Sequence, residues 1–234
     1  MADGFSGFPR ECFRFYRELA KNNNKQWFEL HKGDYESHVL DPARRFVLAL
    51  GERLARLSPG INADPRVDRS IFRIYRDVRF SGDKRPFKTN LGIWLWEGNG
   101  KRMESSGYYI MIEPGTLMLG AGMYMFPKEY LKEYRDSVVH PKHGAALARA
   151  VQAVKKKGTY DLGGEFYKKV PRGYPADHKN APLLLHNGLW AGLEVKVPKE
   201  AYTPGFVDYC YRHFATLYPV HAWLYDMLGR ISKR

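Results

Sequence analysis

The chain has little cysteine, no long apolar run and no signal-like N-terminus. Its 234 residues include two cysteines, Cys12 and Cys210, each in a segment with helical periodicity. In a chain without a secretory signal, we expect both thiols to be reduced core residues. No apolar stretch approaches the roughly 20 residues that span a bilayer, and residues 1–12 lack the basic and apolar regions of a signal peptide. We therefore expect a soluble, cytoplasmic protein without a membrane partner.

Common catalytic and cofactor motifs are also missing. The sequence has no HExxH, CxxC or GxSxG motif, and no GxGxxG beside an expected strand. The stretch 82–90, GDKRPFKTN, lacks the GxxxxGK(S/T) spacing of a phosphate-binding loop. His31, Asp34 and His38 share one helical face, and we expect them to be exposed to solvent. We expect His213 to be half-buried and hydrogen-bonded. The sequence thus predicts no metal and no cofactor, and it names no catalytic residue.

Positive charge and aromatic rings are abundant instead. The chain has 38 Lys and Arg against 25 Asp and Glu, a net charge of +13. Such a balance favours acidic partners, although a basic surface without a nucleic-acid role is the alternative. Hydrophobic residues make up 44% and aromatic residues 15% of the chain, which is ample for a buried, aromatic core.

The charge is concentrated in one segment. The segment from Arg66 to Lys88 contains eight Lys or Arg and three Asp, which gives it a net charge of +5. Apolar residues alternate with these cations and tie them to a packed element, as in sites that bind phosphates or carboxylates. Eight residues are therefore candidate ligand-binding residues: Arg73, Arg76, Asp77, Arg79, Ser81, Lys84, Lys88 and Asn90.

Hydrophobic periodicity and turn residues predict helices, then strands, then helices. Helices are expected over 9–19, 25–38, 41–57, 127–139, 141–157 and 206–231, the last interrupted or kinked at Pro219. Strands are expected over 71–80, 91–96, 108–113, 117–126 and 190–197, with a loop over 158–177. This order predicts an α+β fold with a mostly antiparallel sheet, on which helices from the N- and C-terminal parts pack. We expect one compact domain over residues 1–234.

The segment 71–80 is ambiguous in period, since a helix would also align Arg69, Arg73 and Arg76. Its β-branched and aromatic residues favour a strand. In that strand Arg76 faces the apolar side and must find a partner there. The positive charges of this segment must be neutralised. Either Asp77 pairs with Arg73 or Arg79 in a structural network, or a bound anionic ligand neutralises the cations.

Several motifs together resemble the conserved hypothetical proteins of domain-of-unknown-function family 2461. They are Asn22-Asn23-Asn24 with Trp27-Phe28, Phe72-Arg73-Ile74 running into 76–81 (RDVRFS), residues 83–88 (DKRPFK), and Tyr108-Tyr109 with the following strand. At Phe87 the family usually has Tyr. The resemblance covers nearly the whole chain and implies a single compact domain, without implying an activity.

Three functions follow from these residues. The first is a site, in a binding protein or an enzyme, for a small anionic ligand that bears phosphate or carboxylate groups, which predicts a pocket with largely buried cations. The second is a nucleic-acid-binding module whose footprint includes Lys155-Lys156-Lys157, Lys168-Lys169 and Arg172. The third is a scaffold in which the basic segment is purely structural. Compactness of the segment ranks the small-anion site first, and neither catalysis nor the oligomeric state follows from the sequence.

Overall fold

Six strands form one sheet in the computed structural model of the chain, which describes residues 4–231. Their order is β1-β2-β3-β4-β6-β5, and β5 pairs with β6 in antiparallel register. The strands are β1 (Ile61–Asn62), β2 (Leu91–Glu97), β3 (Gly107–Glu113), β4 (Thr116–Met123), β5 (Asp161–Glu165) and β6 (His186–Lys196). With helices before and after the strands, the predicted α+β class and antiparallel sheet are confirmed.

The helices flank the strand-rich part of the sequence. The α-helices are α1 (Arg10–Lys21), α2 (Lys25–Leu30), α3 (Lys32–Tyr35), α4 (Asp41–Leu54), α5 (Tyr130–Val139), α6 (Pro141–Lys155) and α7 (Phe206–Ile231). A π-helical turn, η1 (Glu36–Leu40), joins α3 to α4, and short 3₁₀ turns are η2 (Arg102–Glu104), η3 (Ala181–Leu185) and η4 (Lys199–Tyr202). None of the helices within residues 4–231 is long and apolar enough to cross a membrane.

The chain divides into two compact units, and each is described by itself. The first comprises the chain up to Leu95, Tyr109–Leu119 and Glu194–Arg212. The second comprises Trp96–Tyr108, Gly120–Leu193 and the chain from His213 on. The expectation of a single domain over the whole chain stays a prediction.

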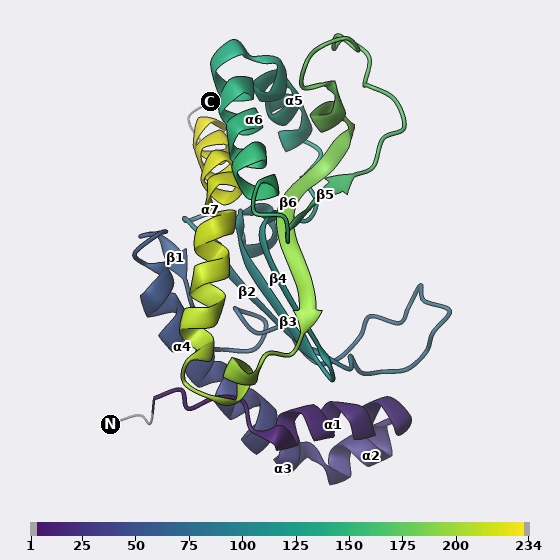
Figure 1. Cartoon of the computed structure of the whole chain (residues 1–234). Coiled ribbons are helices and arrows are strands. Elements are labelled where there is room, and N and C mark those ends of the chain that lie inside the picture. Colours follow the sequence, from purple (N-terminus) through teal and green to yellow (C-terminus); the bar gives the residue numbers. More distant parts are fainter. Residues whose placement is uncertain (1–3, 232–234) are drawn as a thin grey trace. The chain divides into compact units, whose positions relative to one another are not determined.

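Aromatic rings fill the core of the first unit. Phe46 of α4 stacks on Phe206, with ring centroids 5.1 Å apart, and Phe8 meets both rings edge-on. A second cluster lies where α1 contacts α3, which in turn contacts α2 (Figure 1). There Phe15 and Phe28 pack against Tyr35, and all three side chains are buried. These rings bury the apolar face of the N-terminal helices, which are too short to be stable alone.

In the second unit α5 packs against α6, and an asparagine fixes their junction. Asn180 donates through Nδ2 to the carbonyl oxygens of Val138 and Gly144, each at 3.0 Å. Tyr134 of α5 is fully buried, packs on Phe126 and donates its hydroxyl to the carbonyl of Leu183 at 2.8 Å. Both of these buried polar side chains are thus hydrogen-bonded, as is usual for polar groups in a protein core.

Most expected elements are present with small shifts at their ends. Pro9 immediately precedes α1, and Pro141 begins α6, as expected for a residue that lacks a backbone N–H. Cys12 and Cys210 are buried free thiols, as predicted. A β-carbon at Gly122, where φ is +135°, would collide with the backbone of Leu189, so only glycine permits this close approach of the two backbones.

Four local predictions are wrong. Residues 25–38 are not one helix, because the backbone of His31 leaves the helical region (φ −113°, ψ 15°) and separates α2 from α3. The expected loop over 158–177 contains β5. Helix α7 is continuous through Pro219, and the kink expected there as the alternative to an interruption stays a prediction. Their aromatic side chains predict that Trp27 and Phe28 are both core residues; Phe28 is buried, but Trp27 is only half-buried.

The fourth error concerns the strand expected over 71–80, which is an irregular extended segment. Within it only Ile71 and Tyr75 form isolated β-bridges. Carboxylates compete with strand pairing here: Asp77 accepts the backbone N–H of Arg79, and Asp83 accepts that of Arg85. Such local Asx bonds replace the ladder bonds that a neighbouring strand would supply.

Candidate functional site

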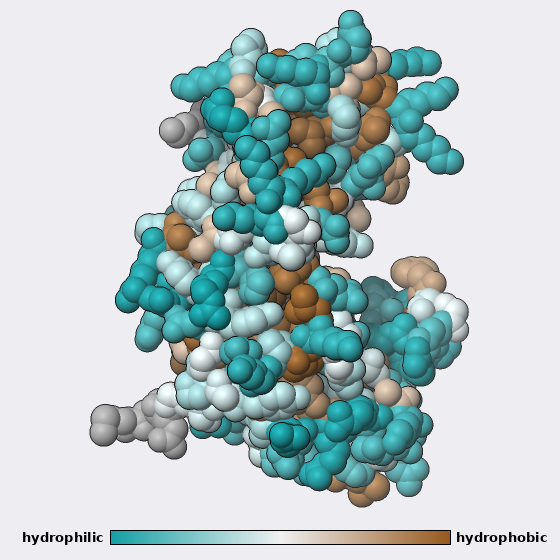
Figure 2. Space-filling view, viewed as in Figure 1, coloured by the Kyte–Doolittle hydropathy of each residue, from teal (hydrophilic) through white to brown (hydrophobic). Residues whose placement is uncertain are grey.

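All eight predicted ligand-binding residues lie in the irregular segment between β1 and β2 of the first unit. We call residues 73–90 the basic loop; it has six Lys or Arg and two Asp, a net charge of +4. The loop extends as an irregular arm (Figure 1), and its surface is mostly hydrophilic with a more apolar patch at the outer end (Figure 2). The cations are therefore displayed at the surface, with the side chain of Arg79 76% and that of Arg85 58% exposed.

Backbone pairing closes the base of the loop. The N–H of Arg76 donates to the carbonyl of Pro86, and the N–H of Lys88 donates to that of Ile74, each at 2.8 Å. Between these bonds Tyr75 forms an antiparallel bridge with Phe87. The buried ring of Phe87 stacks on Phe28 of α2, with centroids 4.4 Å apart. The loop therefore starts from a fixed, packed base.

Asn23 holds this base from the junction of α1 and α2. Its Nδ2 donates to the carbonyl of Phe87 and its Oδ1 accepts the N–H of Phe87, both at 3.0 Å. Asparagine is typical of helix ends, and the neighbours of Asn23 have this role: Asn24 accepts the N–H of Trp27 at the start of α2, and Asn22 follows the last turn of α1. The sequence carries no signal for the contact of Asn23, because the partner lies 64 residues away.

Two aspartates organise the arginines of the loop. Arg79 binds Asp77 through Nε and Nη2 at 3.0 and 2.7 Å, which is one of the two structural pairings predicted for Asp77. Asp83 accepts from Arg85 and also from Nη1 of Arg76 at 2.6 Å. These hydrogen bonds lower the pKa of Asp77 to about 2 and lower the pKa of Asp83 well below its ordinary value, so both are carboxylates at neutral pH.

Arg76 does find a partner, as expected, but in the loop and not on a sheet face. Its side chain is 26% exposed and also donates to the carbonyl of Arg85 at 3.2 Å. The lysines are held by carbonyl groups: Lys84 donates to Val78 and Lys88 to Arg73, each at 3.0 Å. A carbonyl group is neutral, so it orients an ammonium group without neutralising its charge. The loop therefore keeps its net positive charge.

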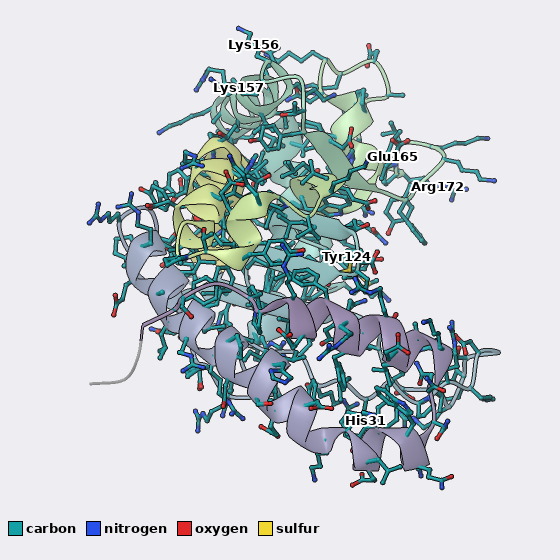
Figure 3. The ribbon with its side chains drawn as sticks, turned by 60° about the horizontal axis from the view of Figure 1, so that its bottom comes forward. His31, Tyr124, Lys156, Lys157, Glu165 and Arg172 are labelled. Carbon is teal, nitrogen blue, oxygen red and sulfur yellow. The ribbon has the colours of Figure 1, made fainter. Side chains whose placement is uncertain are left out.

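None of the eight predicted residues lines the hollow found elsewhere in the first unit. That hollow, of about 290 Å³, lies on α1, α2 and the turns that follow, and its lining is Glu11, Arg14, Phe15, Glu18, Trp27, His31, Asp34 and His38. His31 (Figure 3) stacks on Trp27 at 4.0 Å, and its Nδ1 lies 2.8 Å from the carbonyl oxygen of Trp27. His31 and His38 are half-buried and not fully exposed as expected. Across the described residues, no group of three or more His, Cys, Asp or Glu is arranged to hold a metal.

Comparison with known protein families covers most of the chain. The model of the family described as "Conserved hypothetical protein (DUF2461)" matches residues 11–223, which include the basic loop and most of both units. The chain belongs to the DUF2461 family. No curated protein matches it.

The second unit of this DUF2461 protein contains a buried polar chain that the sequence analysis missed. Nε2 of His221 lies 2.7 Å from Oε2 of Glu97, and its Nδ1 lies 2.8 Å from Oγ of Ser106. All three residues are buried, and Tyr108 packs on the imidazole at 4.6 Å. The serine is closed off from solvent, so we interpret the chain as a satisfied polar network in the core. Separations of 115 and 124 residues give it no local sequence signature.

The lysines and the arginine outside the basic loop that were predicted to extend a nucleic-acid footprint lie in the second unit of the DUF2461 chain. Lys155 ends α6, Lys156 and Lys157 follow it, and Arg172 lies in the loop after β5 (Figure 3). Their side chains are exposed, as are those of Lys168 and Lys169. His213 is half-buried beside the hydroxyl of Tyr160 at 2.8 Å, which confirms its predicted state.

Proposed function

We propose that the basic loop binds the phosphate backbone of a nucleic acid. The observation that carries this proposal is a loop of six cations with a fixed base, in which Arg73, Arg79, Lys84 and Arg85 are exposed. Neutralising phosphates with Lys and Arg releases counterions, which is the main source of sequence-independent affinity for nucleic acids. An exposed loop reaches a polyanion without a pocket, and a fixed base limits the entropy lost on binding.

The aspartates of the loop support the proposal. Asp77 and Asp83 hold the guanidinium groups of Arg79 and Arg85 in a bidentate geometry that a phosphate also accepts. Exposed ion pairs contribute little to stability. The arginines can therefore exchange a carboxylate for a phosphate at little expense, and each carboxylate keeps its arginine oriented before binding.

The small-anion site, ranked first from the sequence, is now the second candidate. It requires cations enclosed around a cavity, because an exposed ion pair with a small ligand is weak in water. In the basic loop Arg79 and Arg85 are more than half exposed, and the hollow described above on α1 and α2 is lined by other residues. The cytoplasmic location inferred from the sequence stays a prediction.

Fluorescence polarisation tests the proposal. The purified chain is titrated into labelled single-stranded and duplex oligonucleotides at several salt concentrations, beside the double variant Lys84→Ala/Arg85→Ala. We expect the parent to bind with affinity that falls steeply with salt. In the double variant the log–log salt slope should become shallower by about 1.4 to 1.8, the effect of two lost phosphate contacts.

A matched control removes the same charge from α1 of the same unit. Arg14→Ala/Lys21→Ala eliminates two exposed cations that pair with Glu11 and Glu18, and we expect it to bind like the parent. If both double variants lose affinity equally, the effect is one of net charge and the loop is not the site. If the parent binds no oligonucleotide but binds inorganic phosphate through Lys84 and Arg85, the small-anion function replaces the proposed one.

A further inference from the structure

One aromatic ring at the tip of the basic loop is almost completely bare. Phe80 is 95% exposed, whereas Phe87 in the base of the loop and Phe28 of α2, on which Phe87 stacks, are each 2% exposed. An exposed phenyl ring forgoes the favourable free energy that burial would give. The loop is folded well enough to bury Phe87, so the exposure of Phe80 is specific to the tip.

Two cations belong to the same tip as this ring. The guanidinium of Arg79 lies 5.7 Å from the centre of the Phe80 ring. Lys84 donates to the carbonyl of Val78, two residues before Phe80, and so brings its ammonium group to the same tip. The tip thus combines one flat apolar face with cations from two sides of the turn.

This combination fits a ligand that alternates negative charges with flat rings. Single-stranded nucleic acid has phosphates for the cations and unpaired bases that stack on aromatic side chains without regard to sequence. A duplex offers the phosphates but keeps its bases stacked inside. An anionic membrane surface would also attract the cations, but a single ring buries little area in lipid, and Asp77 and Asp83 would oppose the approach.

We infer that Phe80 stacks on an unpaired base, so that the ligand of the basic loop is single-stranded nucleic acid. This inference rests on the proposed function, since it assigns the class of nucleic acid bound at the same loop. The Tyr75–Phe87 bridge and the Asn23 contacts hold the base of the loop that presents the ring. The cations then supply most of the affinity, and the ring supplies the preference for single strands.

The experiment compares Phe80→Ala and Phe80→Trp with the parent chain. Affinities are measured by fluorescence polarisation for a labelled 20-nucleotide single strand and for its duplex, over the same salt series. Phe80→Ala should bind the single strand about 5- to 100-fold more weakly, with an unchanged salt slope and unchanged duplex binding. Phe80→Trp should keep the affinity for the single strand. Phe166→Ala, which removes an exposed aromatic ring of the second unit, is the control and should bind like the parent.

The possible outcomes distinguish a failure of the stacking inference from a failure of the proposed function. If the parent binds nucleic acid and Phe80→Ala binds the single strand equally well, the stacking inference is wrong and the proposed function stands. If Lys84→Ala/Arg85→Ala has no effect on any oligonucleotide, the proposed function fails, and this inference fails with it. If Phe80→Ala instead reduces binding to vesicles of phosphatidylserine and phosphatidylcholine, with single-strand binding unchanged, the ring contacts lipid and the inference is overturned.

Discussion

Removing the Asn23 side chain should detach the base of the basic loop. In Asn23→Ala, both polar groups of the Phe87 backbone lose their partners, each at 3.0 Å in the parent. A part-buried hydrogen bond contributes about 1 kcal/mol, and more when its partner is left unsatisfied. We therefore expect the free energy of unfolding to fall by about 2 to 3 kcal/mol, which for a chain of this size lowers the melting temperature by about 4 to 12 °C.

Urea unfolding measures the loss of global stability, and native-state hydrogen exchange measures the local loss of protection at Phe87. The unfolding midpoint should fall with an unchanged m-value, and the amide of Phe87 should exchange faster because it no longer donates to Asn23. Asn23→Asp keeps the acceptor for that amide but places a carboxylate oxygen against the Phe87 carbonyl, so it should destabilise at least as much as alanine.

Asn22→Ala is the matched control. The side chain of Asn22 donates only to the carbonyl of Glu18 at the end of its own helix, and its loss should lower the unfolding free energy by less than about 1 kcal/mol. The reasoning is refuted if Asn23→Ala unfolds within 0.5 kcal/mol of the parent, about the scatter of neutral surface changes, and keeps the protection of the Phe87 amide.

Three further predictions concern buried and titrating groups. Glu97→Ala removes the carboxylate that His221 contacts in the core, and urea unfolding should show a loss of about 2 to 4 kcal/mol; a loss below 1 kcal/mol would mean that the contact is dispensable. Burial raises the pKa of Cys12 to about 12, so mass spectrometry should find it unmodified by iodoacetamide at pH 8 until urea is added. The pKa of Asp77 is lowered to about 2 by Arg79, so the stability from this pair is present above pH 4 and lost as the pH falls toward 2. Carbon-13 NMR should place the carboxyl midpoint near 2 in the parent and higher in Arg79→Ala, though below the ordinary 3.8, because Arg73 and the backbone N–H of residue 79 still lower this pKa.

The sequence alone determined the elements whose signals are local. Apolar periodicity with Pro9 and Pro141 located α1 and α6, and alternating apolar residues around the Pro114-Gly115 turn located the β3–β4 hairpin. These signals succeed because a helix start or a tight turn depends on the preferences of a few neighbouring residues. The same reasoning found the charged segment and named Arg79, two residues from Asp77, as one of two possible partners for that carboxylate.

Only the tertiary structure decided the features that depend on contacts between residues far apart in the sequence. Residues 71–80 have strand composition, but local carboxylate bonds and the packing of Phe87 on Phe28 make them one side of an irregular loop. The contact of Asn23 with Phe87 and the network of Glu97, Ser106 and His221 join residues 64 to 124 positions apart. The sequence identified the charges of the candidate site, whereas only the fold decided that the charges and Phe80 face solvent, because exposure depends on which distant segments pack against a loop and which leave it bare.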